Sequence, residues 1–299
     1  MQQREKTDRP WLPLAAASLG HILWGFSVLL SKVALQAAPP EVLLSVRFLA
    51  AALIMTVLLL LDRSRVSFRG KHPKPLILLA VSELVYFYFE SYGILYTNAT
   101  FAGVVLAVVP VVAIGTAILF LREFPTRRQA GFCLLPVAGV VMMTVSGSSL
   151  GIIRPLGVAF LMGACLSSAA YKTANRKSAE EFTPFERTYV VILSCAVVFT
   201  LSAVRAVHGD MSAYLKPLSE PAFLLPVLAL SLFCSVGCNI LVNYAAGRMP
   251  VVTLSSFGSL TTLCSMFAGV LFLREPLTPG LLAGALLILV GIRQVTKDK

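Results

Sequence analysis

Two glutamates, Glu83 and Glu90, stand seven residues apart inside a long apolar run. Seven residues are about two turns of an α-helix, so both carboxyls would lie on one helix face with Tyr86 on or beside it. An ionisable side chain deep in a bilayer is costly, and such residues commonly mark ion or substrate pathways. We therefore predict that Glu83 and Glu90 act in proton coupling or bind the ammonium group of a solute. A structural ion pair with Lys32 or Arg47 is the alternative.

A second set of polar and aromatic side chains lies within other apolar runs. Its members are His21, Trp24, Ser167, Tyr171, Lys172, Asn239 and Asn243. Tryptophan offers a surface for stacking or cation–π contact, and an imidazole can change charge near neutral pH. Hydroxyls and amides in membrane helices also hydrogen-bond one helix to another. We predict that this set, with Glu83, Tyr86 and Glu90, binds a substrate, and ordinary packing is the alternative for His21.

Three further charged residues, Arg47, Glu123 and Glu275, are predicted to be structural. Arg47 would pair with carbonyl groups or a carboxylate. Each of the two glutamates stands where a helix should start, and there a carboxylate meets free N–H groups and the positive helix end. Arg187 is expected near the membrane interface. The six cysteines fall inside apolar runs and lack metal-ligand spacing, so we predict no disulfide, no metal and no cofactor.

The composition determines which elements must position these residues. Of the 299 residues, 57% are hydrophobic and 13% are charged, whereas soluble domains carry about 25% charged residues. A helix needs about 20 residues to cross hydrocarbon. Ten runs of roughly that length are Leu12–Ala37, Val42–Leu61, Pro75–Tyr96, Thr100–Leu121, Gln129–Ser146, Leu156–Asn175, Phe185–Val207, Ala222–Ala246, Val251–Leu273 and Leu281–Val295. We expect an all-α integral membrane protein of ten transmembrane helices, because helices satisfy their own backbone groups in lipid.

The formal net charge of +11 reflects topology rather than nucleic-acid binding. Lysines and arginines gather in alternate breaks between the apolar runs and form no continuous basic face. The positive-inside rule then places the N- and C-termini in the cytoplasm, with the plasma (inner) membrane as the expected location.

The two halves of the chain share a repeated motif. Phe120-Leu121-Arg122-Glu123 recurs as Phe272-Leu273-Arg274-Glu275, an offset of 274 − 122 = 152 residues, and Gly139 meets Gly291 at the same offset. Residues 1–150 and 151–299 would thus be two five-helix repeats. Because five is odd, the second repeat enters the membrane from the opposite side. Inverted repeats are common in secondary transporters, where the substrate site lies near the midplane between the halves.

An ordered set of short motifs runs through both halves. Its residues are Trp24, Gly25, Lys32, Pro40 and Arg47; Tyr92, Thr97, Ala99 and Ala102; Leu121, Glu123, Thr126, Gln129, Gly131 and Gly139; Tyr171, Arg176 and Pro184; and Leu273, Glu275, Thr278, Gly284 and Gly291. In this set the chain resembles the drug/metabolite transporter superfamily, in its EamA-type branch with ten helices. The resemblance implies secondary transport of small organic solutes, often amino acids or related metabolites.

We therefore expect a transporter of a small polar metabolite, such as an amino acid, working by alternating access. Mixed charge at Glu83, Glu90 and Lys172 suits a zwitterion. An anion exchanger for organic phosphates or nucleotide sugars, centred on Lys172, is a second hypothesis. A membrane enzyme, a lipid-handling protein or a channel is the alternative of a different class, although the sequence contains no recognisable catalytic constellation and we expect no enzyme. The expected partners are the solute and the lipid bilayer, and the oligomeric state is open.

Overall fold

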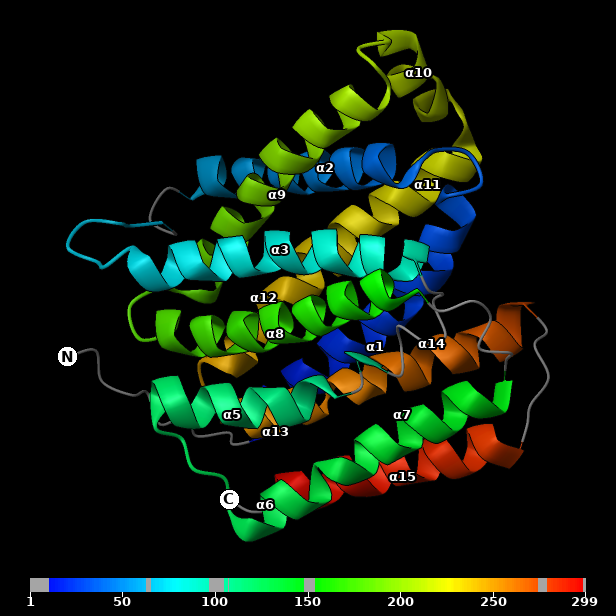
Figure 1. Ribbon diagram of the computed structural model, residues 1–299. Helices are drawn as coiled ribbons and strands as arrows, with labels where there is room; N and C mark the ends of the chain where they lie inside the picture. The colour runs from blue at the N-terminus through cyan, green and yellow to red at the C-terminus, as the bar shows by residue number, and fades with distance from the viewer. Residues whose placement is uncertain are drawn as a thin grey trace.

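The computed structural model describes residues 11–62, 66–96, 105–106, 108–147, 154–273 and 279–297, and it contains helices but no strand within these ranges. The helices are α1 (Trp11–Ala34), α2 (Pro40–Leu61), α3 (Lys74–Tyr96), α5 (Val109–Leu121), α6 (Arg127–Phe132), α7 (Leu134–Gly147), α8 (Pro155–Ser178), α9 (Pro184–Ala206), α10 (Met211–Leu215), the 3-10 helix η2 (Lys216–Ser219), α11 (Pro221–Ala229), the π-helix η3 (Leu230–Cys238), α12 (Asn239–Ala246), α13 (Val251–Ser256), α14 (Gly258–Leu273) and α15 (Pro279–Thr296). Most run roughly side by side, with α2, α9 and α3 at one edge and α7 and α15 at the other (Figure 1).

Helix starts follow directly from local sequence. Proline occupies the first turn of α2, α8, α9 and α11, where its missing N–H is no loss. Thr126 and Thr183 form capping boxes with Gln129 and Glu186 at the starts of α6 and α9. Where the structure describes them, the predicted runs coincide with helices to within a few residues. The beginning of the run Thr100–Leu121 lies outside the described residues.

Two predicted runs are interrupted, and a third changes its helical type without a break. Gln129–Ser146 divides into α6 and α7 at Cys133, because Pro136 has no N–H to donate to the carbonyl four residues earlier. Ala222–Ala246 passes from α11 through η3 to α12, with Pro226 inside α11. The run Val251–Leu273 has a turn at Phe257, immediately before Gly258. Local π-helical geometry is frequent at functional sites.

Large apolar side chains cover much of the outer surface of the bundle, and charged and polar side chains are buried among the apolar residues inside it. Leu53, Leu119 and Leu225 are at least 66% exposed, whereas Arg187 and Asn243 are at most 1% exposed. Four described helical segments are long and apolar enough to cross a membrane: Pro40–Leu61, Pro155–Ser178, Pro184–Ala206 and Pro221–Ala246. The chain is thus an all-helical membrane protein, while the number of ten crossings stays a prediction.

The helix contacts bring the two halves of the chain together. Helix α3 packs along α8, α2 along α9, and α1 against η3, α12 and α14. Helices α7 and α15 lie especially close, since a Cβ atom on Gly139 would collide with the carbonyl of Gly284, and one on Gly291 would collide with Pro136. Small residues allow such close approach in membrane helices.

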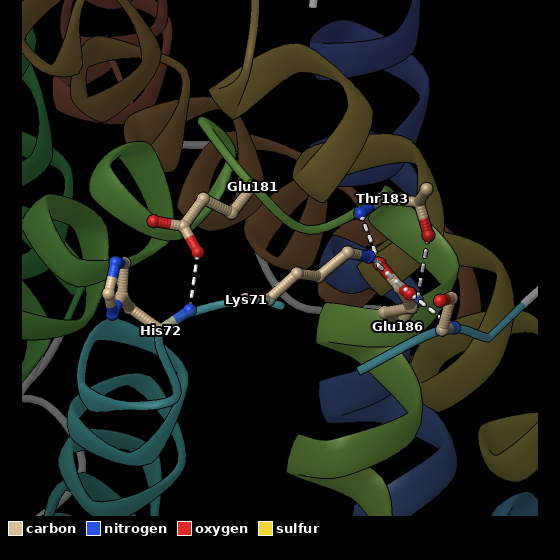
Figure 2. Close-up of polar contacts among 6 residues, drawn as sticks. Lys71, His72, Glu181, Thr183 and Glu186 are labelled. Carbon is tan, nitrogen blue, oxygen red and sulfur yellow. Dashed lines mark hydrogen bonds and ion pairs between the residues drawn. The ribbon is translucent and has the colours of Figure 1, made fainter. Parts of the chain in front are cut away.

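A network centred on Glu186 ties the segment between α2 and α3 to the start of α9 (Figure 2). The carboxylate accepts hydrogen bonds from the Ser67 N–H at 2.7 Å and the Thr183 N–H at 2.7 Å. The Lys71 ammonium donates to both carboxylate oxygens, at 2.6 Å and 2.7 Å, which makes four bonds. Only 1% of Glu186 is exposed. Hydrogen bonds to a buried charged group contribute more than neutral ones, so this carboxylate should stabilise the fold.

Replacing Glu186 with alanine is expected to lower the free energy of unfolding by about 2–4 kcal/mol, because the substitution removes all four bonds and leaves a partly buried ammonium unpaired. Thermal unfolding in detergent measures the effect. Glu181→Ala is the matched control, since that more exposed carboxylate accepts one bond, from the His72 N–H (Figure 2). Equal losses of melting temperature in the two variants would show that the bonds of Glu186 do not stabilise the fold more than the single bond of Glu181.

Candidate functional site

Glu83 on α3 and Lys172 on α8 bring opposite charges to one region of the bundle, because α3 packs along α8. The Glu83 carboxylate interacts electrostatically with Lys172 and Arg47, and also with the like charge of Glu90. Within the described ranges, neither Glu83 nor Lys172 has a hydrogen bond or an ion pair at contact distance, and both side chains are half-buried. These two charged groups are therefore free to engage a ligand.

Glu90 is held more firmly than Glu83. The Tyr86 hydroxyl donates a hydrogen bond to Glu90 Oε1 at 2.6 Å, one helical turn away on α3. A hydroxyl bonded to a carboxylate is a strong, charge-assisted pair. Both side chains are half-buried. The hydrogen bond between Tyr86 and Glu90 fixes both side chains, whereas Glu83 on the same helix has no such partner among the described residues.

Side chains from α1 and α8 converge on the turn between α13 and α14. His21 Nδ1 lies 3.1 Å from Thr261 Oγ1, and its ring stacks on Phe257 at 6.5 Å between centroids. From the other side, Lys172 Nζ lies 3.9 Å from the place a Cβ atom would take on Gly258. His21 and Lys172 also interact electrostatically. The structure thus joins these two predicted site residues around the helix interruption at Phe257.

Trp24 and Ser167 use their polar atoms within the protein. The Trp24 indole N–H donates to the Cys234 carbonyl at 3.1 Å, which fixes α1 against η3, and its ring meets His21 edge-on at 5.2 Å. The Ser167 hydroxyl donates to the Gly163 carbonyl of its own helix at 2.9 Å. Both side chains are half-buried. The Trp24 ring and the exposed part of Ser167 can still contact a solute. The indole N–H and the hydroxyl proton are already used in these bonds, so neither can be donated to the solute.

Tyr171 and Asn239 join the site from its buried side. The Tyr171 hydroxyl lies 3.5 Å from Asn239 Oδ1, and the Asn239 amide donates to the Ser235 carbonyl at 2.9 Å. Tyr171 also interacts electrostatically with Glu83. The pair therefore connects α8 and α12 next to Glu83.

Asn243 belongs to a different, fully buried cluster. Its amide oxygen accepts from Asn175 Nδ2 at 2.7 Å, and its Nδ2 donates to Thr188 Oγ1 at 2.8 Å. Its side chain is 0% exposed. With both amide atoms bonded inside the protein, Asn243 connects α8, α9 and α12, and the structure does not bring it to Glu83.

Arg187 is the centre of this cluster, and its side chain is buried within the protein; its depth near the membrane interface stays a prediction. Arg187 is 1% exposed. Its guanidinium donates to the Asn175 carbonyl at 3.0 Å, to the Asn175 side chain, and to the Asn243 carbonyl at 2.6 Å. Asn243 is among the last four residues of α12, whose carbonyls lack partners in their own helix, so an arginine in the first turn of α9 could have been suspected as the donor to such a group.

Arg47 binds a hydroxyl rather than the expected carbonyl or carboxylate. Its Nε donates to Ser235 Oγ at 2.8 Å, and the Ser231 hydroxyl donates to the Arg47 carbonyl at 2.9 Å. Its guanidinium lies 5.6 Å from the centre of the Phe48 ring. These contacts join α2 to η3, while the interaction with Glu83 acts at longer range.

Glu123 meets a helix start, but not the one expected from its position in sequence. Helix α6 begins at Arg127 under the cap of Thr126. Because Arg122 adopts a left-handed conformation (φ 54°) at the end of α5, the chain turns and directs Glu123 elsewhere. Its carboxylate accepts from Arg176 Nε at 2.8 Å and from the N–H of Val251, the first residue of α13, at 3.1 Å. Glu275 and the side chain of Lys32 lie outside the described part of the chain.

Comparison with known proteins identifies the class. The EamA-like transporter family model matches residues 11–145 and again residues 155–296. The chain belongs to this family, and it is therefore a multi-pass membrane transporter.

Relatives and solved structures agree with this assignment. A protein of Bacillus subtilis called "Uncharacterized transporter YcxC" is 33% identical over 281 residues, covering 93% of this chain and 90% of that one. A protein of Chlamydia trachomatis called "S-adenosylmethionine/S-adenosylhomocysteine transporter" is 25% identical over 296 residues, covering 94% and 88%. A solved structure described only as "Crystal structure of protein" has a TM-score of 0.73 at 18% identity, covers 95% of this chain and 96% of its own, and shares the fold.

Proposed function

We propose that this protein is a secondary transporter of a small polar metabolite that carries both an amino and an acidic group, such as an amino acid. The observation that carries the proposal is the pair Glu83 and Lys172. These opposite charges stand on adjacent helices, half-buried, and neither has a fixed partner among the described residues. A charge kept inside a membrane bundle without a structural partner is most simply explained by a transported ligand.

The arrangement suits a zwitterion. Glu83 would receive the ammonium group and Lys172 the carboxylate, while the aromatic rings of Trp24, Tyr86 and Tyr171 would flank the side chain of the solute. Glu83 and Glu90 are the acidic groups through which proton coupling would run. Asn239 and Ser167 would complete the lining, and Asn243 would support it through α12.

Contacts at one end of the bundle support alternating access. Arg176 donates to Glu123 at 2.8 Å and to the Gly247 carbonyl at 2.8 Å, so it joins α8, the α5–α6 segment and the end of α12. Glu123 and Arg176 are 25% and 22% exposed, and an ion pair with that exposure contributes only about 1 kcal/mol or less. Such contacts can break and reform during a transport cycle. If the termini are cytoplasmic, these contacts would hold the cytoplasmic end of the bundle together.

The same proposal includes ten helices in two inverted repeats, residues 1–150 and 151–299. The family model matches once in each half. Gly139 and Gly291, which correspond at the 152-residue offset, both lie in the contact between α7 and α15. This mutual packing of corresponding residues is what a twofold relation between the repeats requires.

The test is ligand-dependent stability of the purified protein in detergent. Melting temperature would be measured with amino acids, polyamines, nucleosides, organic phosphates, nucleotide sugars, S-adenosylmethionine and S-adenosylhomocysteine. The two sulfur compounds are included because the Chlamydia relative is named for them and both carry an amino-acid group. A ligand that binds only the folded state stabilises it by about 2.7 kcal/mol at 100 times its Kd.

Stabilisation confined to solutes with an amino-acid group is the expected result, with the same shift in the control Glu181→Gln. Stabilisation confined to phosphates would instead favour an anion exchanger centred on Lys172. Binding of no solute, together with turnover or movement of lipid, would replace the transporter proposal with a lipid-handling protein or an enzyme.

A further inference from the structure

The contacts of Thr261 favour one tautomer of the His21 imidazole. Thr261 Oγ1 donates its single proton to the His21 backbone carbonyl at 3.1 Å. The same oxygen lies 3.1 Å from His21 Nδ1, and with its proton on the carbonyl it accepts a hydrogen bond from that nitrogen. In the neutral ring Nδ1 therefore carries the proton, and Nε2 presents a lone pair. Thr261 thus makes Nε2 of His21 a hydrogen-bond acceptor.

His21 Nε2 lacks the partner that a buried acceptor normally has. The side chain is 4% exposed, and Nε2 has no hydrogen bond to any residue that the structure describes. An unsatisfied buried polar atom costs about 1–3 kcal/mol. The ring is also held rigidly, by Phe257 stacked at 6.5 Å and by Trp24 edge-on at 5.2 Å. A rigid acceptor without a partner is preorganised to bind a donor.

His21 shares its surroundings with Lys172. His21 and Lys172 approach the same stretch, Phe257–Thr261, from two different helices, and they interact electrostatically. Lys172 in turn interacts with Glu83. The acceptor on His21 therefore lies on the side of the bundle where Lys172 is found, and Lys172 is the charge proposed above to bind the carboxylate of a zwitterion.

We propose that His21 is a specificity-determining residue whose Nε2 accepts a hydrogen bond from an N–H or O–H group on the side chain of the transported solute, and that Thr261 is the positioning residue that fixes this acceptor. The inference rests on the proposed function and narrows its substrate class. Glu83 and Lys172 would bind the amino and carboxylate groups of the solute. The group that donates a hydrogen bond to His21 would therefore be on the side chain of the solute. Hydroxyl, amide, indole or exocyclic amino groups meet this requirement, and a purely aliphatic side chain does not.

The experiment compares matched solutes that differ in one donor. The pairs are serine and alanine, threonine and valine, tyrosine and phenylalanine, tryptophan and 1-methyltryptophan, and S-adenosylhomocysteine with its N6,N6-dimethyl analogue. Apparent Kd is obtained from the melting-temperature shift of the full-length protein in detergent. The variants are His21→Asn, whose amide can keep the bond to Thr261 but has no acceptor at the Nε2 position, and His21→Gln, whose amide oxygen reaches approximately that position.

Wild-type protein is expected to bind the donor-bearing member of at least one pair about tenfold more tightly, since a site built to bond a donor rejects the analogue without it. His21→Asn should reduce this preference to about twofold or less by weakening the donor-bearing solute alone, and His21→Gln should restore part of it. Thr261→Val, which leaves the ring in place, should also lower the preference and so provides a variant that does not depend on replacing His21.

Two results overturn the inference alone, while the proposed function stands. One is binding of amino acids with no preference in any pair. The other is a preference that survives unchanged in His21→Asn and Thr261→Val. Failure of every solute to stabilise the wild-type protein overturns the proposed function, and the role of His21 with it.

Discussion

Glu83→Gln is expected to reduce transport of an amino-acid solute at least tenfold while leaving the bundle folded. The carboxylate has no fixed partner among the described residues, so its loss breaks no structural bond. A glutamine of nearly the same volume removes only the charge that would receive the ammonium group and the proton. A hydrogen bond to a charged group contributes about 1.5–3 kcal/mol, and 1.4 kcal/mol corresponds to a tenfold change in affinity.

Uptake of labelled solute into proteoliposomes measures this effect, with melting temperature as the check on folding. Glu90→Gln is the matched variant on the same helix face. The effect of Glu90→Gln should be smaller, because the amide oxygen can still accept the bond from Tyr86 that Glu90 accepts at 2.6 Å. Normal transport in Glu83→Gln would remove Glu83 from the site.

Arg187→Leu is expected to produce the largest loss of stability, about 3–5 kcal/mol. The guanidinium bonds the carbonyls of Asn175 and Asn243, at the ends of α8 and α12, from its own position in the first turn of α9. Leucine fills similar space but removes the donor from the Asn243 carbonyl and from the side-chain oxygen of Asn175, both of which are buried. Three helices would lose their common polar contact.

Thermal unfolding in detergent tests this prediction. Arg205→Leu is the matched control, because Arg205 lies on the same helix but is exposed near its end and should change stability by less than about 0.5 kcal/mol. Arg187→Lys should fall between the two, since an ammonium cannot reproduce the guanidinium fork. A melting temperature for Arg187→Leu equal to that of Arg205→Leu would show that the buried cluster does not stabilise the fold.

The apolar runs, and the proline residues near their ends, predict much of this fold. The boundaries of α2, α3, α8 and α9 follow from apolar runs that begin at or near proline, because both signals are local. The interruptions at Cys133 and Phe257 and the π-helix η3 are less visible. Whether Pro136 or Pro226 breaks or distorts the helix that contains it depends on packing against neighbouring helices. The sequence alone therefore predicted one regular helix for each of the two apolar runs that contain these prolines.

The candidate site was predictable in residue type but not in pairing. Burial of ionisable groups in apolar runs singled out Glu83, Glu90 and Lys172. The hydrogen-bond partners of Glu123 and Asn243 depend on how the helices of the two halves are rotated and aligned against each other. No local sequence pattern specifies that arrangement. Glu123 binds the start of α13 as a carboxylate should, yet Val251 is 128 residues away in sequence.

We propose that this EamA-family protein moves a zwitterionic solute through the site at Glu83 and Lys172 by alternating access. Counterflow is the decisive measurement of such transport. Proteoliposomes are loaded with an unlabelled solute that raises the melting temperature, and labelled solute is then supplied outside at trace concentration. We expect transient, saturable accumulation of label above its equilibrium level, absent in Glu83→Gln and retained in Glu181→Gln. Linear, unsaturable entry that does not depend on the internal solute would show a passive channel instead of an alternating-access transporter.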